Sequence, residues 1–373
     1  MTGEKERLTS SDERKLRVAV LFGGRSDEHD VSLRSAQTVI GALDPDRFEV
    51  VPIGITRRGR WLNATGGDPM QALISASPMF GAAPDGETSA LVAWEQRAPT
   101  TLPPDATEGI DVVFPVMHGP MGEDGTVQGM LELAGVPYVG AEVLGSAVAM
   151  DKAIAKTLCA QAGLPQLPWL VVQRREWERD PATVETLIGE KLGFPCFTKP
   201  ANLGSSVGIS KVRGPEDLHG ALVEAAHYDR KIVVERGVDA REIELAVLGN
   251  DEPLASVAGE IVPRSEFYDY NAKYVDDSAE LHVPAAIDPE LLTYFQDLAI
   301  AAFRALDLAG MARVDFFLER HTDHIYINEV NTIPGFTSIS MYPMLWEASG
   351  IPLPELVERL IALAIERHAD RRR

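Results

Sequence analysis

The sequence predicts an α/β protein with more than one domain, and three observations carry that prediction. At 373 residues, the chain exceeds the length of one average domain. An apolar run over residues 16–24 ends in two glycines and is followed by a helical pattern, which is typical of the opening of a doubly wound α/β unit. Residues 311–340 contain two β-rich runs joined by a short polar connection, the signature of a hairpin.

The composition favours an ordinary globular protein of a reducing compartment. No apolar run approaches the ~18 residues that a membrane-spanning helix needs. The net charge of -21 argues against nucleic acid or an anionic membrane as the main partner. Cys159 and Cys196 have no metal-binding or redox spacing, and residues 1–15 lack the apolar stretch of a secretory signal. We therefore expect a cytoplasmic protein with a flexible tail over residues 1–15.

The first α/β unit continues with strands over residues 48–55 and 110–117, separated by a region rich in Gly, Pro, Ala and Ser that indicates surface loops. The later strand runs directly into HGPMGEDG. Ligands of open α/β sheets usually bind at such a loop. His118, Glu123 and Asp124 are therefore candidate ligand groups, although a hydrogen-bonded structural histidine fits the pattern equally well.

A Gly/Ser loop in the stretch TKPANLGSSVGISKV links two strand-like runs. Backbone N–H groups freed by glycine, together with the hydroxyls of Ser205 and Ser206, can form a concave anion site, and Lys199 adds a point charge suited to phosphate. A plain hairpin turn would also explain the glycines. The P-loop motif GxxxxGK[ST] does not occur, so a P-loop nucleotide site is excluded. Before this stretch, residues 146–163 predict one helix with Lys152 near a capped turn.

The hairpin carries the strongest metal signal. If its turn centres on Thr322, Asp315 faces Glu329 and Arg313 faces Asn331, with all four side chains on one face. Two carboxylates at roughly 5 Å between Cβ atoms repel each other, so a cation should lie between them. Oxygen ligands without nearby His or Cys suit Mg²⁺ that carries substrate phosphates. The alternative is a solvated sheet face, against which the register of the apolar residues Phe317, Ile325 and Ile327 argues.

Other acidic and aromatic segments are less decisive. Glu242 and Glu244 alternate on one face of a strand that follows Glu235. They could bind amino or hydroxyl groups of a ligand, but solvent-facing strand residues are the favoured interpretation from the residues alone. The aromatic, charged stretch EFYDYNAKYVDDSAELHVP has no clean period, and a loop of that length is usually functional, so a lid is expected over residues 266–283.

Several motifs in order carry a family resemblance: GGRSDEHDVS, HGPMGEDG, MDK, TKPANLGSSVG, FYDYNAKY, MARVDFF and NEVNTIPGFTSIS. From about Leu16 to the final helix, the sequence resembles the D-alanine:D-alanine ligases of the ATP-grasp superfamily. The resemblance implies a three-domain ATP-grasp fold with an N-terminal Rossmann-like (pre-ATP-grasp) domain. The expected parts are residues 16–140 for the N-terminal substrate-binding domain, 141–234 for the central domain, 235–373 for the C-terminal domain, and 311–335 for the metal-binding hairpin.

The resemblance also implies roles for individual residues. Two Mg²⁺ (or Mn²⁺) ions would be held by Asp315, Glu329 and Asn331. ATP would contact Lys152, Lys199, Ser205 and Ser206 through its phosphates, Glu235 near adenine and Glu242 on the ribose. The first D-alanine would be held by Glu28 with help from His118, and its developing oxyanion by Arg313. The second D-alanine subsite would be lined by Gly335 and Ser340. The lid would contribute Lys273 and Tyr274, with Tyr274 in a hydrogen-bond chain toward Glu28 and Ser205.

The activity implied by the resemblance is ATP-dependent ligation of two D-alanines through an acyl phosphate, for peptidoglycan precursor synthesis, without a covalent enzyme nucleophile. A homodimer is expected on the same ground. Two alternatives stay open. One is another ATP-grasp ligase, such as one that joins D-alanine to D-lactate or to another amine; the other is a non-catalytic nucleotide-binding protein that retains the fold.

Overall fold

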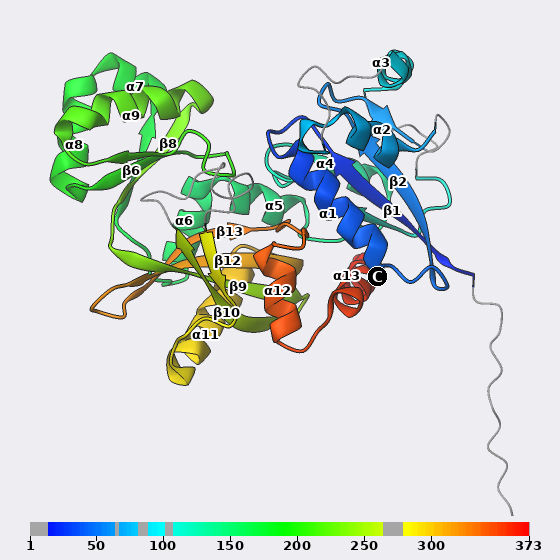
Figure 1. The fold of residues 1–373 in the computed structure, drawn as a ribbon. Helices are drawn as coiled ribbons and strands as arrows, with labels where there is room; N and C mark the ends of the chain where they lie inside the picture. Colours follow the sequence, from blue (N-terminus) through cyan, green and yellow to red (C-terminus); the bar gives the residue numbers. More distant parts are fainter. Residues whose placement is uncertain (1–13, 64–66, 81–88, 101–106, 264–278, 373) are drawn as a thin grey trace, which may run out of the picture.

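The computed structural model describes residues 14–63, 67–80, 89–100, 107–263 and 279–372, and the strands among them form three sheets (Figure 1). Most of the predicted tail and most of the predicted lid, including Lys273 and Tyr274, lie outside the described residues. No helix in the described ranges combines the length and apolar character needed to cross a membrane.

The first sheet has the strand order β3-β2-β1-β4, in which β1 pairs in parallel with β2 and β4, while β3 is antiparallel to β2. Apolar side chains of α1 pack on one face of this sheet and those of α4 on the other, as expected of a doubly wound unit. The elements are β1 (Leu16–Gly23), α1 (His29–Ala42), β2 (Phe48–Ile55), β3 (Trp61–Leu62), α2 (Pro69–Ala76), η1 (Pro78–Phe80), α3 (Ser89–Glu95), β4 (Val112–Pro115) and α4 (Thr126–Ala134).

Glycine is required where β1 turns into α1. Gly23 has φ +86, and a Cβ there would lie 2.2 Å from the carbonyl oxygen of Ile55. Only glycine fits so close to a neighbouring backbone. The turn brings Glu28 to the N-terminal end of α1. The prediction that residues 61–104 are surface loops was wrong in part, because α2 and α3 lie there; Asp68 caps α2 by accepting the N–H groups of Met70 and Gln71.

The second sheet is antiparallel, in the order β5-β8-β6-β7, and its apolar face is covered by α7, α8 and α9. Local signals set the helix starts. Asp180 caps α8, and proline occupies the first turn of both α8 and α9. The elements are β5 (Trp169–Gln173), α7 (Arg174–Arg179), α8 (Pro181–Leu192), β6 (Cys196–Pro200), β7 (Ser210–Val212), α9 (Pro215–Tyr228) and β8 (Lys231–Arg236).

The third sheet is also antiparallel, in the order β11-β10-β9-β12-β13. Phe295 of α11 meets Phe316 of β12 edge to face, with ring centroids 5.2 Å apart, in the core on one face of this sheet. The elements are β9 (Ala240–Gly249), β10 (Leu254–Pro263), β11 (Ala279–His282), α11 (Pro289–Ala305), β12 (Gly310–Glu319), β13 (Ile325–Asn331), α12 (Met341–Ala348) and α13 (Leu353–Asp370).

The single helix predicted over residues 146–163 is two helices, α5 (Val143–Met150) and α6 (Lys152–Gln161). Asp151 interrupts them because it is extended and its side chain accepts the N–H groups of Ala153 and Ile154, which starts a new helix. Both helices pack against the core of the third sheet, although they precede the second sheet in sequence. The domain boundaries at residues 140 and 234 stay predictions.

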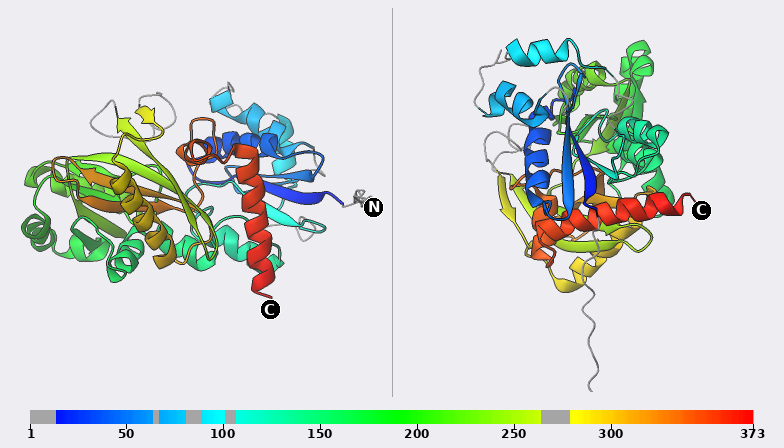
Figure 2. Two further views of the ribbon diagram at one scale, coloured as in Figure 1. Left: turned by 90° about the horizontal axis from the view of Figure 1, so that it is seen from below. Right: turned by 90° about the vertical axis from the view of Figure 1, so that its right-hand side faces the viewer.

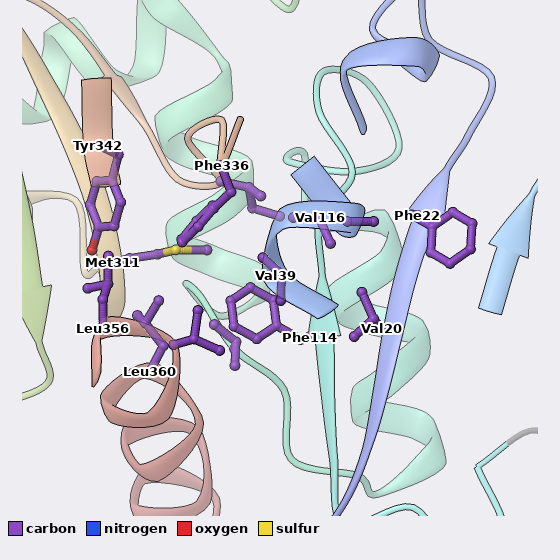
Figure 3. Close-up of a cluster of buried hydrophobic side chains, with 14 of the residues drawn as sticks. Val20, Phe22, Val39, Phe114, Val116, Met311, Phe336, Tyr342, Leu356 and Leu360 are labelled. Atoms are coloured by element: carbon purple, nitrogen blue, oxygen red, sulfur yellow. The ribbon is translucent and has the colours of Figure 1, made fainter. Parts of the chain in front are cut away.

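One apolar cluster joins the first sheet to the C-terminal part of the chain (Figure 3). Phe114 of β4 meets Phe336 edge to face at 5.8 Å, and Tyr342, Leu356 and Leu360 lie in the same cluster. The C-terminal helix α13 lies against the N-terminal domain in both views of Figure 2. This packing places the loop after β4 beside the segment that follows β13.

Candidate active site

A cavity of about 650 Å³ lies between the second and third sheets. Its wall includes Ser206 of the Gly/Ser loop as well as strand residues. The charged side chains that line it are Lys199, Lys211, Glu235, Arg236, Asp239, Arg241, Glu242, Glu244, Glu260, Asp315, Arg320 and Glu329. Carboxylates outnumber basic groups in this set. A polyphosphate would therefore need added positive charge here.

The predicted hairpin register is confirmed at the site. Asp315 pairs with Glu329 and Arg313 with Asn331. Arg313 forms two bonds to Asp315, from Nε to Oδ1 at 2.7 Å and from Nη2 to Oδ2 at 2.8 Å. The amide of Asn331 donates to Asp315 Oδ2 at 2.9 Å. Arg313 Nε also lies 3.0 Å from Oε2 of Glu244, so Glu244 is a buried partner of the site rather than a solvent-facing residue.

The predicted strand register was wrong for the part of the hairpin nearer its turn. The pairing shifts after Asp315, so that Phe316 faces Ile327 and Phe317 faces Tyr326. This β-bulge leaves Asn328 as the extra residue and reverses the faces beyond it. Ile325 and Ile327 therefore lie in the apolar core with Phe316, not beside Glu329. Asn328 and Glu329 both line the cavity as a result.

The donor set at the hairpin fits a hard cation. Two carboxylates and one amide leave several coordination positions for water or phosphate oxygens, which is the preference of Mg²⁺. Asn331 would present its oxygen after rotation of the amide by about 180°. No group of three or more His, Cys, Asp or Glu side chains with metal-binding geometry occurs in the described part of the chain, so an all-protein cage is not formed there.

The Gly/Ser loop joins the cavity to the N-terminal domain. Ser205 and Ser206 have φ of 49 and 59, a conformation that costs energy for residues with a side chain and is often kept at functional sites. The Ser205 hydroxyl donates to Glu28 Oε1. Lys152 Nζ donates to the carbonyl of Leu203 at 2.7 Å and lies 3.5 Å from Glu329 Oε2. The structure thus brings together Glu28, the loop, Lys152 and the hairpin.

A buried ion cluster lies at the inner wall of the cavity. Glu235 Oε1 pairs with Lys156, and Glu235 Oε2 accepts from Lys199 at 2.7 Å. Lys199 also donates to Asn328 Oδ1 at 3.2 Å. Burial opposes ionisation of Glu235, but Lys199 and Lys156 outweigh it and hold the pKa of Glu235 below its usual range. The sequence reasoning missed Lys156; its signal was a lysine on the buried face of α6, between Ala153 and Cys159.

His118 and Glu123 hold the loop after β4 against the segment after β13. His118 Nδ1 donates to the carbonyl of Ile333 at 2.9 Å, and Nε2 lies 3.2 Å from the Ser35 hydroxyl. Burial lowers the pKa of His118 despite the charge of Glu28.

Glu123 accepts the N–H of Gly119 at 2.6 Å and that of Ile333 at 3.1 Å. Burial, reinforced by Glu28, raises the pKa of Glu123 to about 8. Asp124 bonds within its own loop, to the N–H groups of Met121 and Thr126.

Comparisons with known proteins agree on one family. A family model described as "D-ala D-ala ligase N-terminus" matches residues 17–141, and one described as "D-ala D-ala ligase C-terminus" matches residues 158–362. A D-alanine--D-alanine ligase of Geobacillus thermodenitrificans is 51% identical over 358 residues, which cover 96% of this chain and 97% of that protein. The chain belongs to the D-alanine:D-alanine ligase family.

Solved structures of ligases share the fold. The D-alanine-D-alanine ligase from Coxiella burnetii superimposes with a TM-score of 0.79 at 36% identity, covering 96% of each chain. The VanG D-Ala:D-Ser ligase from Enterococcus faecalis has a TM-score of 0.79 at 34% identity, covering 94% of this chain and 100% of that one. The predicted α/β ATP-grasp fold and the predicted class of ATP-dependent ligase are confirmed.

In this member of the D-alanine:D-alanine ligase family, Gly335 and Ser340 lie next to each other in space. A Cβ at Gly335 would lie 2.6 Å from Ser340 Oγ, so glycine leaves room for that hydroxyl. Ser340 Oγ accepts the N–H of Thr337 at 2.9 Å. Glu242 lines the cavity, although the residues alone favoured a solvent-facing position. The roles of Gly335, Ser340, Glu235 and Glu242 toward ligands stay predictions, as do those of the other site residues.

Proposed function

We propose that this chain joins two D-alanines into D-alanyl-D-alanine and converts ATP to ADP and phosphate. The observation that supports this best is that the Gly/Ser loop contacts both sides of the site: Ser205 bonds to Glu28, and Leu203 accepts from Lys152, which also lies 3.5 Å from Glu329 Oε2. The loop connects an acidic group on the N-terminal domain to the nucleotide-sized cavity. An amino acid held at Glu28 would therefore meet the end of a nucleotide bound between the two sheets. The names of the relatives agree with this chemistry.

ATP and two Mg²⁺ (or Mn²⁺) ions are proposed to occupy the cavity, with Asp315, Glu329 and Asn331 as the protein ligands of the metal. The facing carboxylates and the excess of acidic lining groups support this. Bound metal would neutralise charge on the phosphates and so make the terminal phosphoryl group a better electrophile. Lys199 and Lys152 would donate to phosphate oxygens. The left-handed backbone at Ser205 and Ser206 supports a role for this loop in binding an anion.

At the other end of the site, Glu28 is proposed to bind the ammonium group of the first D-alanine. His118 supports this role by positioning, since both of its ring nitrogens already have partners. Arg313 is proposed to bind a carboxylate oxygen of that D-alanine and the oxyanion that develops from it. Ser340 and the adjacent Gly335 would form the subsite for the second D-alanine.

The proposed reaction has two steps. The γ-phosphoryl group of ATP passes to the carboxylate of the first D-alanine, because a free carboxylate is a poor electrophile, and ADP leaves. The amine of the second D-alanine then attacks the acyl phosphate, loses a proton, and phosphate departs as the amide forms. Catalysis is mainly positioning and stabilisation of negative charge by Arg313 and the lysines. Ser205 and Ser340 are hydrogen-bonding groups here, since Ser205 is bonded to Glu28 and Ser340 to Thr337.

The test is phosphate release from ATP with Mg²⁺ and D-alanine, L-alanine, or D-alanine with D-lactate, with products identified by mass. We expect release that depends on D-alanine and yields the dipeptide. Release that requires a different acceptor would move the function to a sister ligase. The absence of turnover with any of these substrates would contradict the proposal and favour a nucleotide-binding protein without ligase activity.

The second substrate is proposed to be selected by the lid, through Lys273 and Tyr274. Because a D-Ala:D-Ser ligase shares this fold, the acceptor requires its own test. We predict that Tyr274→Phe shifts the preference toward hydroxy acids such as D-lactate at lower pH, where the amine of D-alanine is protonated. Product ratios between pH 6 and pH 9 measure this. An unchanged ratio would remove that role from Tyr274.

We also propose a cytoplasmic homodimer without a nucleic-acid or membrane partner. The net charge of -21 supports the absence of polyanionic partners. Sedimentation measurements at several protein concentrations test the dimer.

A further inference from the structure

The cluster of Lys156, Glu235 and Lys199 contains two ammonium groups and one carboxylate. The two oxygens of Glu235 are divided between them, with Oε1 paired to Lys156 and Oε2 to Lys199. Glu235 is 2% exposed and Lys156 is 4% exposed, so solvent ions screen the attraction between them only weakly. Glu235 therefore has two lysine partners, one on each carboxylate oxygen.

The three residues differ in their access to a ligand. Lys199 and Glu235 are among the described residues that line the cavity, whereas Lys156 is not. Lys156 lies on α6, behind Glu235 as seen from the cavity. It can influence a nucleotide only through Glu235 and through the charge of the cluster.

The second lysine, Lys156, would keep Glu235 paired when a phosphate group binds near Lys199. A buried carboxylate that loses its cation is strongly destabilised. If Glu235 had Lys199 alone, movement of the Lys199 ammonium toward a phosphate oxygen would leave Glu235 unpaired. With Lys156 on Oε1, Glu235 keeps a partner during that movement. Asn328 Oδ1, on the hairpin bulge, holds Lys199 on the cavity side.

We propose that Lys156 is a positioning residue for the nucleotide: it keeps Glu235 paired and in place, so that Lys199 can direct its charge to the phosphates. This inference rests on the proposed use of ATP and adds a residue that the motifs did not indicate. Because the family resemblance implies that Glu235 lies near adenine, Lys156 acts on phosphate affinity more than on binding of the base, and not on D-alanine.

The test compares ADP with adenosine, using calorimetric titration of Lys156→Gln and Lys156→Met in the full chain. We expect the Kd for ADP to rise about tenfold, which is typical of an indirect coupling between groups. The Kd for adenosine should rise by a smaller factor, less than about threefold, since adenosine lacks the phosphates that Lys199 would contact and retains only the expected contact of its base with Glu235. Lys156→Arg, which keeps the charge, should retain most of the ADP affinity. Lys191→Met, at an exposed lysine on α8, is the matched control and should bind like the wild type.

A double variant tests whether Lys156 acts through Glu235. In a Glu235→Gln background, Lys156→Gln should change the ADP Kd by less than about twofold. Equal losses for ADP and adenosine, or an unchanged ADP Kd in Lys156→Gln, would overturn the inference. Lys156→Gln keeps a hydrogen-bond donor toward Glu235, so it serves if Lys156→Met fails to fold. The titrations contain no D-alanine, so a wild type that binds ADP but forms no dipeptide would refute the proposed function alone.

Discussion

Glu235, which is buried, and Glu123, which is half-buried, are two carboxyl groups of the candidate active site, and their pKa values shift in opposite directions. Burial opposes ionisation of both. Glu235 lies between two lysines, which hold its pKa below the usual range. Glu123 has two backbone N–H partners and the like charge of Glu28 nearby, and its pKa is raised to about 8. The type of partner, and not burial, decides which carboxyl group carries charge at neutral pH.

The difference separates two tasks. In the proposed function, the carboxylate of Glu235 would hold two lysine side chains in place for a polyanion. Glu123 joins the loop after β4 to the segment after β13 without adding a full charge beside Glu28. A second full charge there would strengthen the repulsion between the two groups. Three substitutions test this comparison.

The hairpin offers the largest expected effect, because Glu329, which faces Asp315, is proposed to bind the metal ion and not to support the fold. We predict that Glu329→Ala lowers D-alanine-dependent phosphate release by about 10³-fold, as loss of charge stabilisation in a transition state commonly does. The melting temperature should stay near the wild-type value, since repulsion across the hairpin is relieved.

Glu319→Ala, near the turn of the same hairpin, is the matched control and should keep full activity. Phosphate release and thermal unfolding of both variants provide the measurement. An active Glu329→Ala protein would remove Glu329 from the metal site.

Glu235→Ala, which removes the carboxylate between Lys156 and Lys199, should lower the free energy of unfolding more than Glu329→Ala or Glu123→Gln does. Glu235→Ala leaves two buried ammonium groups together, and we predict a loss of about 3–5 kcal/mol in the free energy of unfolding. Urea unfolding at pH 7 measures it, with Glu190→Ala, at an exposed position on α8, as the control. A loss below about 1 kcal/mol would show that the cluster does not act as a charged unit.

Of the three substitutions, Glu123→Gln should change the free energy of unfolding least when it is measured at low pH. The size of this change should depend on pH. The folded pKa of about 8 exceeds the unfolded value of 4.5. The native state therefore binds more protons in this window, and the contribution of Glu123 to stability falls as pH rises from about 4.5 through about 8. The slope can reach about 1.4 kcal/mol per pH unit.

Glutamine does not titrate, so the stability of the wild type relative to Glu123→Gln should fall between pH 5 and pH 8. At pH 5 the variant should be less stable by about 1 kcal/mol, because its amide cannot accept from both backbone N–H groups. The Glu235 contribution has the opposite sign: it is present above about pH 4.5 and is lost as pH falls below that value. A flat difference between wild type and Glu123→Gln would contradict the raised pKa.

Much of the fold follows from local sequence signals. The strands over residues 16–23, 48–55 and 112–115 and the pairing of Asp315 with Glu329 depend on residues close in the chain. Their physical causes are the period of apolar residues and the twofold alternation of a strand. These signals, with the order of the motifs, were sufficient to predict the α/β class and the ligase family.

The sequence alone determined which chemical groups are present: facing carboxylates on a hairpin, a Gly/Ser loop with Lys199, and the acidic turn at Glu28. Only the tertiary structure decided their partners. Ser205 meets Glu28 from 177 positions away, and Lys156 meets Glu235 from 79 positions away. The bulge at Asn328 decided that Ile325 and Ile327 lie in the apolar core while Glu329 lines the cavity. No local period encodes such contacts, because they depend on how separate sheets pack and on which buried charges then require a partner.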